Sequence, residues 1–224
     1  MNTGGLIMVR LLTRMGDDMS LTLIHVFGDS HSGSFHGCNG YLVHTIGRCT
    51  AHNLICPSSS TQGKAKIDAI LKTLPVSSNV LFIFGEIDCR IHIYNKHMMD
   101  KQQYPLSHYI HWTIQRYGRF LQYIKQCYPT HVYVMAVPPA NYEGNEFHYP
   151  YYAPTRERAY IYRTFNETLK QKCVNLSLPF IDINSHVTLS NGFTDRRYMR
   201  DDVHLSRRAI PLVTTELQRL GCLV

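Results

Sequence analysis

The chain has 224 residues, 44% of them hydrophobic, and a formal net charge of +7 at pH 7. This length fits one domain, and the hydrophobic fraction can build a single large core, which excludes intrinsic disorder, collagen and coiled coil. The excess of lysine and arginine favours an anionic partner but defines no function by itself. The 7 cysteines are scattered without a CxxC pair, which is typical of reduced thiols in an intracellular protein.

The first residues of the chain do not have the pattern of a targeting or membrane segment. Their short apolar patch is broken by Arg10, Arg14 and Asp17, so the apolar core of a signal peptide is missing. No apolar run in the chain approaches the roughly 18 residues that a membrane-spanning helix needs. We therefore expect residues 1–20 to form a loose leader, residues 21–224 to form one domain, and the protein to be soluble and intracellular.

Apolar runs predict β-strands, and the amphipathic stretches between them predict helices. Strands are expected over residues 21–27, 41–46, 80–84, 132–137 and 180–183, and helices over 62–74, 106–127, 155–174 and 207–220. Nearly continuous hydrophobicity is typical of strands buried on both faces of a parallel sheet. The order of the elements predicts an α/β fold, a three-layer α/β/α sandwich around a five-stranded parallel sheet. Such sheets bind ligands beyond the carboxyl ends of their strands.

One expected helix carries a stripe of large apolar residues at steps of three and four. The stripe consists of Tyr109, Trp112, Ile114, Tyr117, Phe120, Leu121 and Ile124. This spacing predicts one buried helix face, and core packing explains it better than a cofactor site does. His92 and His97 are five residues apart and have no surrounding ligand set, so we expect no metal site.

The first strand leads into Gly28-Asp29-Ser30. A serine at such a turn presents its hydroxyl at the edge of the sheet, and its N–H lies near a helix N-terminus, where an oxyanion is favoured. The same serine could simply cap the helix. Near the other end of the chain, Asp201 and His204 are spaced so that the carboxylate can hold one imidazole nitrogen, which leaves the other to accept a proton from a serine hydroxyl.

Together these two segments resemble the SGNH (GDSL-type) hydrolase superfamily, whose first block is Gly-Asp-Ser and whose last is Asp-x-x-His. The resemblance covers about residues 21–220, with the blocks in the order of the family. It is greatest for the subgroup with Gly-Asp-Ser-His-Ser and Phe-Gly-Glu-Ile-Asp-Cys-Arg, here residues 28–32 and 84–90. The resemblance implies the flavodoxin-like fold of SGNH hydrolases.

The resemblance also assigns roles to individual residues. It implies that Ser30 is the nucleophile, His204 the general base and then acid, and Asp201 the orienting carboxylate, a role for which the family spacing favours Asp201 over Asp202. It further implies that the N–H of Gly47, after the second strand, joins the N–H of Ser30 in the oxyanion hole.

The third block departs from the family pattern. The common sequence is Gly-x-Asn-Asp, whose asparagine donates to the oxyanion, whereas Ile87 occupies that position here and has no donor. Loss of one such donor costs on the order of a hundredfold or more in rate. Arg90 could replace the donor, could bind an anionic or hydroxyl group of the substrate, or could form a structural ion-pair network with Glu86 and Asp88.

Polar and aromatic side chains at the strand ends are candidates for contact with a substrate. They are Asp29, His31, Glu86, Asp88, Asn141 and Tyr142. Asp29 is expected to organise its turn instead of doing chemistry. Residues 138–152 could line a saccharide or acyl pocket, or could form a rigid loop packed on its own surface.

The sequence therefore predicts a serine esterase that acts on an O-acylated, for example O-acetylated, carbohydrate or a similar small ester, without a metal or organic cofactor. Acyl transfer to a sugar hydroxyl would use the same groups. A different class is a catalytically weak carbohydrate-binding protein that kept the pocket, which the isoleucine at position 87 favours. Nucleic acid is not an expected partner, because no nucleic-acid motif accompanies the basic residues.

Overall fold

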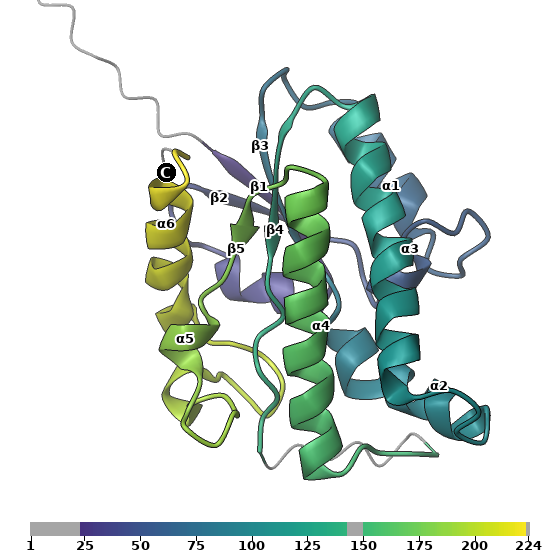
Figure 1. The fold of residues 1–224 in the computed structure, drawn as a ribbon. Coiled ribbons are helices and arrows are strands. Elements are labelled where there is room, and N and C mark those ends of the chain that lie inside the picture. The colour runs from purple at the N-terminus through teal and green to yellow at the C-terminus, as the bar shows by residue number, and fades with distance from the viewer. Residues whose placement is uncertain (1–22, 143–149, 223–224) are drawn as a thin grey trace, which may run out of the picture.

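The computed structural model of the protein describes residues 23–142 and 150–222. Its centre is a five-stranded sheet in the order β2-β1-β3-β4-β5, and all neighbouring strands are parallel (Figure 1). The strands are β1 (Ile24–Gly28), β2 (Tyr41–Thr45), β3 (Asn79–Ile83), β4 (His131–Met135) and β5 (Phe180–Ile181). This strand order is the flavodoxin-like one, so the predicted fold class is confirmed. The expected leader, residues 1–20, lies outside the described residues.

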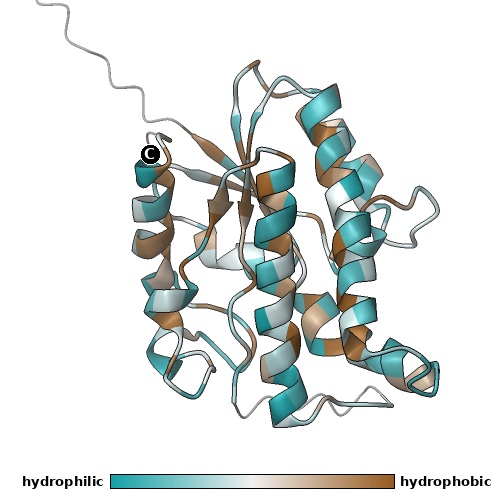
Figure 2. Ribbon diagram, in the orientation of Figure 1, coloured by the Kyte–Doolittle hydropathy of each residue, from teal (hydrophilic) through white to brown (hydrophobic). Residues whose placement is uncertain are grey.

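Helices cover both faces of the sheet (Figure 1). They are α1 (Gly63–Leu71), α2 (Ile93–Met99), α3 (Leu106–Cys127), α4 (Thr155–Asn175), α5 (Asn184–Val187) and α6 (Ile210–Arg219). Helices α1, α3 and α4 pack on one face, and α5 and α6 on the other. In Figure 2 strand β5 is hydrophobic, whereas α4 carries hydrophilic residues over much of the surface that it turns to the viewer.

Each central strand contributes side chains to two cores. Phe27 of β1 and Phe82 of β3 point to the α3 side, where Phe82 meets Phe120 with the ring centroids 5.7 Å apart. Their neighbours Val26 and Leu81 point to the α6 side. Successive side chains of a strand alternate between faces, so burial of both sets explains the continuous hydrophobicity of these runs.

Three features differ from the sequence prediction. Strand β5 stops at Ile181 because the next residue, Asp182, accepts a hydrogen bond from the Asn184 N–H at 3.1 Å and turns the chain into α5. Helices α2 and α5 were not predicted, since both are too short to show a helical period. Trp112 lies outside the buried stripe of α3 and is 39% exposed, so its placement in the core was wrong.

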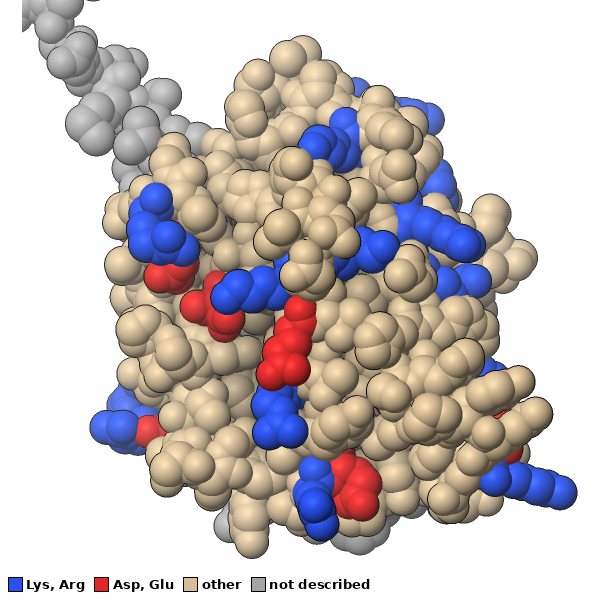
Figure 3. Space-filling model, viewed as in Figure 1, with Lys and Arg blue, Asp and Glu red and all other residues tan. Residues whose placement is uncertain are grey.

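On the face drawn in Figure 3, acidic residues lie beside basic ones on the left and in the lower half, whereas a group of basic residues at the upper right has no acidic residue among it. Two of the ion pairs are Lys64 with Asp68 at 2.6 Å and Arg219 with Glu216 at 2.9 Å. Among the described residues, no helix is long and apolar enough to cross a bilayer.

Candidate active site

Strand β1 and a short 3₁₀ helix position Ser30. Gly28 ends the strand, and a Cβ there would come within 2.9 Å of the Ile83 carbonyl oxygen, so only glycine lets the two chains approach this closely. Asp29 caps the helix Ser30–Phe35 by accepting the His31 N–H at 2.9 Å. The cap is therefore Asp29 and not Ser30, and the alternative that Ser30 serves only as a cap is wrong.

Ser30, His204 and Asp201 form one hydrogen-bonded chain. His204 Nε2 lies 2.8 Å from Ser30 Oγ, and His204 Nδ1 lies 2.9 Å from each carboxylate oxygen of Asp201. Asp201 Oδ1 also accepts the backbone N–H groups of Val203 and His204, at 2.9 and 2.7 Å. The carboxylate thus holds the turn and the imidazole together, and the opposite ring nitrogen faces the serine hydroxyl.

The electrostatics of the site favour a neutral imidazole beside a carboxylate. Partial burial opposes the ionisation of Asp201, but the N–H groups of His204 and Val203 and the imidazole of His204 outweigh it and hold its pKa well below the usual range. Burial, together with the neighbouring His31, lowers the pKa of His204, although Asp201 acts in the opposite direction. His204 can therefore accept a proton near neutral pH.

Gly47 lies just after the carboxyl end of β2, beside the end of β1, and borders open space. It follows β2, has a φ of 99°, and a Cβ added there would meet no atom within 4 Å. The preceding residue, Ile46, donates its N–H to the Gly28 carbonyl at 2.8 Å, which ties this loop to the end of β1. Gly47 therefore lies at the same edge of the sheet as the turn that carries Ser30, and binding of an oxyanion by its N–H stays a prediction.

Ile87 is buried, 8% exposed, at the start of a π-helical turn (Asp88–His92). Arg90 of this turn donates from Nε to both carboxylate oxygens of Glu86, at 2.9 and 3.2 Å. Glu86 and Arg90 therefore form an ion pair, as one of the alternatives predicted. Asp88 does not join them, and the predicted three-residue network is wrong in that respect.

The predicted substrate contacts fall into two groups. The side chains of Asp29, His31, Glu86 and Asp88 are buried among protein partners and are at most 5% exposed. Asp88, for example, accepts the N–H groups of Ala51 and His52 at 2.7 and 3.2 Å. Asp29 and His31 have almost no surface for direct contact, so their structural partners account for them better, whereas Glu86 and Asp88 each line a cleft with the small part of their surface that is exposed.

Asn141 and Tyr142 lie in the loop after β4, where Asn141 is buried and Tyr142 reaches the surface. Asn141 donates to the Asp202 carbonyl at 3.2 Å, and Tyr142 is 57% exposed and packs edge-on against Phe193. A small cleft next to the His204 turn is lined by Asn141, Arg90, Glu86, Asp202 and Val203, among others. Residues 143–149 of this loop lie outside the described residues.

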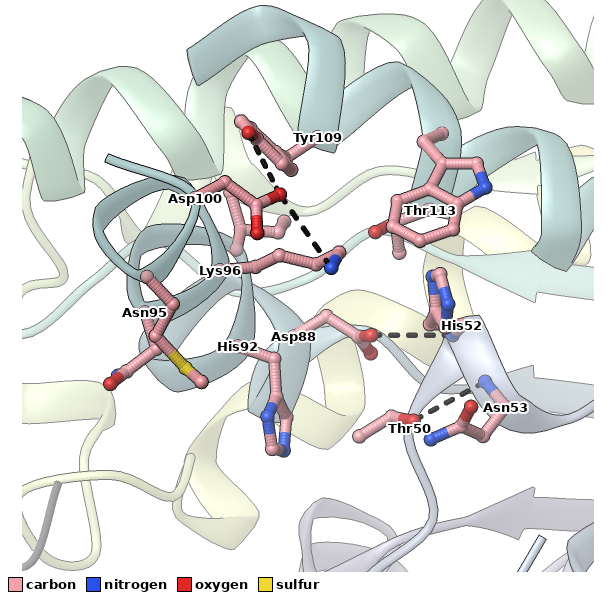
Figure 4. A pocket seen from close by; sticks show the side chains of 13 residues that line it. Thr50, His52, Asn53, Asp88, His92, Asn95, Lys96, Asp100, Tyr109 and Thr113 are labelled. Atoms are coloured by element: carbon pink, nitrogen blue, oxygen red, sulfur yellow. Dashed lines mark hydrogen bonds and ion pairs between the residues drawn. The ribbon is translucent and has the colours of Figure 1, made fainter. Parts of the chain in front are cut away.

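A pocket of about 280 Å³ opens beside the loops that follow β2 and β3 (Figure 4). It is lined by Thr50, His52, Asn53, Asp88, His92, Ile93, Asn95, Lys96, Met99, Asp100, Tyr109, Trp112 and Thr113. These residues come from the loop after Gly47, from the turn after β3, from α2 and from α3. The sequence pattern did not indicate this pocket, because Trp112 has the spacing of a core residue and the loop and turn that form other walls have no periodic signal.

The pocket combines an aromatic surface with polar groups. The Trp112 ring meets His52 edge-on with a centroid separation of 4.6 Å, and Lys96 Nζ lies 5.1 Å from the Trp112 ring centroid. Lys96 also pairs with Asp100 at 3.7 Å (Figure 4). Burial, with nearby cations, lowers the pKa of His52 to about 4, so its ring is neutral at pH 7. The described residues contain no cluster of three metal-binding side chains.

Comparison with known proteins identifies the fold. No family model and no curated protein sequence matches the chain. Solved structures do match: a GDSL-like lipase from Bacteroides thetaiotaomicron is 13% identical with a TM-score of 0.59, covering 90% of this chain and 88% of the lipase. The aryl esterase of M. smegmatis is 14% identical with a TM-score of 0.52, covering 91% and 100%.

An acetyl xylan esterase is 12% identical with a TM-score of 0.53, covering 90% of this chain and 100% of the esterase. These likenesses extend over almost the whole described chain. The protein therefore has the fold of the GDSL-type lipases and esterases, and the resemblance to SGNH hydrolases is confirmed at the level of the fold.

Proposed function

We propose that the protein is a serine esterase of the SGNH type. The observation that carries this proposal is the unbroken chain from Ser30 Oγ to His204 to the Asp201 carboxylate, with every link between 2.8 and 2.9 Å. It lies beyond the carboxyl end of β1, where an open parallel sheet offers space for a ligand. The esterase and lipase folds matched above are consistent with this chemistry, but the geometry of this chain supports it residue by residue.

The reaction follows from the positions of the groups. His204 Nε2 takes the proton of Ser30 while Oγ attacks the ester carbonyl, and the N–H groups of Ser30 and Gly47 bind the oxyanion that develops. Protonated His204 then delivers its proton to the departing alcohol, which leaves an acyl group on Ser30. A water molecule that gives its proton to His204 attacks this acyl group, and His204 returns the proton to Ser30 Oγ as the acid is released.

Ile87 leaves the oxyanion hole with one donor fewer than the common family pattern. Arg90 stays a proposed contributor, because it lines the cleft next to Val203 in the His204 turn. Its ion pair with Glu86 fixes the position of the guanidinium, which would favour a rigid contact with a polar group of the substrate.

The first test is whether Ser30 is reactive. We expect the purified protein to hydrolyse p-nitrophenyl acetate and to become labelled by a fluorophosphonate, with the label on Ser30 in peptide mass spectrometry, because a hydrogen-bonded imidazole activates the hydroxyl. The neighbouring Ser32, whose buried hydroxyl donates to the Asp29 carbonyl at 2.7 Å, should stay unlabelled. If Ser30 is not labelled and no ester is hydrolysed, the esterase proposal is wrong and the binding-protein alternative favoured by Ile87 replaces it.

The substrate class that fits the pocket of Figure 4 is an O-acylated carbohydrate. Sugars bind to sites in which an exposed aromatic ring is surrounded by amide, hydroxyl and charged groups, because their rings have both apolar faces and polar edges. Trp112 offers such a ring, and Asn53, Thr50 and Asp100 line the same pocket. Thr50 and Gly47 belong to the same loop after β2, which links this pocket along the chain to the proposed oxyanion donor.

Replacement of Trp112 with alanine tests this substrate class. We expect KM for an acetylated oligosaccharide to rise about fivefold, because the lost stacking surface contributes on the order of 1 kcal/mol to binding. kcat/KM for p-nitrophenyl acetate, which has no sugar ring to stack on Trp112, should change less than about twofold. Tyr104→Ala is the matched control, since Tyr104 is an exposed aromatic residue outside the pocket. An equal change on both substrates would contradict the proposal.

A further inference from the structure

A second histidine lies directly behind His204. The ring of His31 packs against the ring of His204 with a centroid separation of 4.6 Å and a tilt of 35°. Unlike His204, His31 is buried, with 5% of its surface exposed. It does not contact Ser30 Oγ or the open space beside Gly47 in the contacts above, so the mechanism gives it no role.

Both ring nitrogens of His31 face oxygen acceptors. Nδ1 lies 2.8 Å from Asp29 Oδ1, and Nε2 lies 3.4 Å from Glu86 Oε2 and 3.3 Å from the Val203 carbonyl oxygen. A neutral imidazole has one nitrogen without a proton, and this lone pair would then point at an oxygen. Only the imidazolium, which has an N–H on both nitrogens, satisfies these partners together.

The charges around His31 favour the same state. Asp29 and Glu86 are two buried carboxylates, and Arg90 pairs with Glu86. His31 lies between the two acids, with its ring nitrogens 2.8 Å from Asp29 Oδ1 and 3.4 Å from Glu86 Oε2, a position that favours a cation. Among the described residues, Asp29 Oδ2 is buried without a hydrogen-bond donor, which increases the need for a neighbouring positive charge.

We propose that His31 is a buried imidazolium whose charge keeps His204 in its neutral, proton-accepting form in more acidic solution than an isolated histidine would allow. A cation 4.6 Å away disfavours a second positive charge on His204. His31 is thus a positioning residue that acts through His204 and also donates to Val203 in the same turn. Protonated His204 becomes a stronger acid, which favours proton delivery to the departing alkoxide. This catalytic consequence rests on the proposed function.

Other titratable and charged groups surround the pair of His31 and His204. They are Asp29 after β1, Glu86 and Arg90 after β3, Tyr162 of α4, and Asp201 and Arg200 of the His204 turn. Burial alone would lower the pKa of His31, but Glu86 and Asp29 together raise it above its ordinary value in spite of Arg90. Asp201 favours a charged His204, and His31 and Arg200 oppose it.

The test combines a direct readout with a kinetic one. Nitrogen-15 NMR of the histidine rings in the full chain should show His31 with both nitrogens protonated at pH 7 while His204 is neutral. In His31→Gln, whose amide can still donate to Val203, the acidic midpoint of kcat/KM for p-nitrophenyl acetate and the NMR midpoint of His204 should both rise by about one pH unit. His36→Gln, an exposed histidine close by in the sequence, should leave both midpoints unchanged.

A neutral His31 at pH 7, or a His204 midpoint that stays in place in His31→Gln, would overturn the inference. The NMR titration needs no turnover and uses the wild-type chain as well as the variant, so it decides the point even if the variant is unstable. It also separates this inference from the proposed function, whose failure would show instead as an unlabelled Ser30.

Discussion

Replacing Ser30 with alanine is expected to lower kcat/KM for p-nitrophenyl acetate by on the order of 10⁴-fold or more, to the background rate. The reason is that Oγ is the atom that bonds to the acyl group, and no other hydroxyl lies in hydrogen-bond contact with His204 Nε2 among the described residues. The side chain is small and exposed, so its loss should not affect folding. Steady-state kinetics and thermal unfolding of the purified variant measure the two effects separately.

Ser185→Ala is the control for this variant. Ser185 is an exposed serine of α5, outside the candidate site, and its loss should leave kcat/KM unchanged. A Ser30→Ala protein that retains more than about a tenth of the wild-type rate, with normal unfolding, would show that another group carries the activity. Fluorophosphonate labelling of that variant would then locate the group.

Much of the fold could be predicted because the strands carry their own signal. Runs such as 80–84 are apolar on both faces only because helices cover both sides of the sheet, and their order along the chain then predicts the sandwich. The ends of the strands were less accessible to prediction. A strand ends where its pairing with the neighbouring strand ends, as the pairing of β4 with β5 does after Ile181. Side chains such as Asp182 then turn the chain away from the sheet.

The part of the site whose geometry depends on spacing along the sequence could be predicted, whereas the part that depends on tertiary packing could not. Asp201 and His204 are three residues apart, so their contact is local, and the family resemblance supplied Ser30 as the distant partner. The buried cluster behind them needed the structure. No spacing rule brings Glu86 to within 3.4 Å of His31, and only burial shows that His31 faces acids instead of substrate. Trp112 likewise has the helical spacing of the buried stripe, and only the structure shows that its side chain lines a pocket.

A second large effect on kcat/KM is expected when Asp201, and not the neighbouring Asp202, is replaced with asparagine. In Asp201→Asn, Oδ1 can still accept the N–H groups of the turn, but the amide NH₂ replaces the second carboxylate oxygen that lies 2.9 Å from His204 Nδ1. The amide favours the imidazole tautomer with its proton on Nε2, which cannot accept the proton of Ser30. We therefore expect kcat/KM to fall by about 10³- to 10⁴-fold, with little change in the free energy of unfolding.

Asp202→Asn is the matched control, because it makes the same chemical change one residue away. Asp202 is 67% exposed at its side chain and pairs with Arg196, which is itself 57% exposed, so the pair contributes at most about 1 kcal/mol to stability. Its contact with Asn141 uses the backbone carbonyl and survives the substitution. kcat/KM of Asp202→Asn should therefore stay within about threefold of the wild type. A loss as large as that of Asp201→Asn would mean that the His204 turn adopts a different register during turnover, with Asp202 on the imidazole.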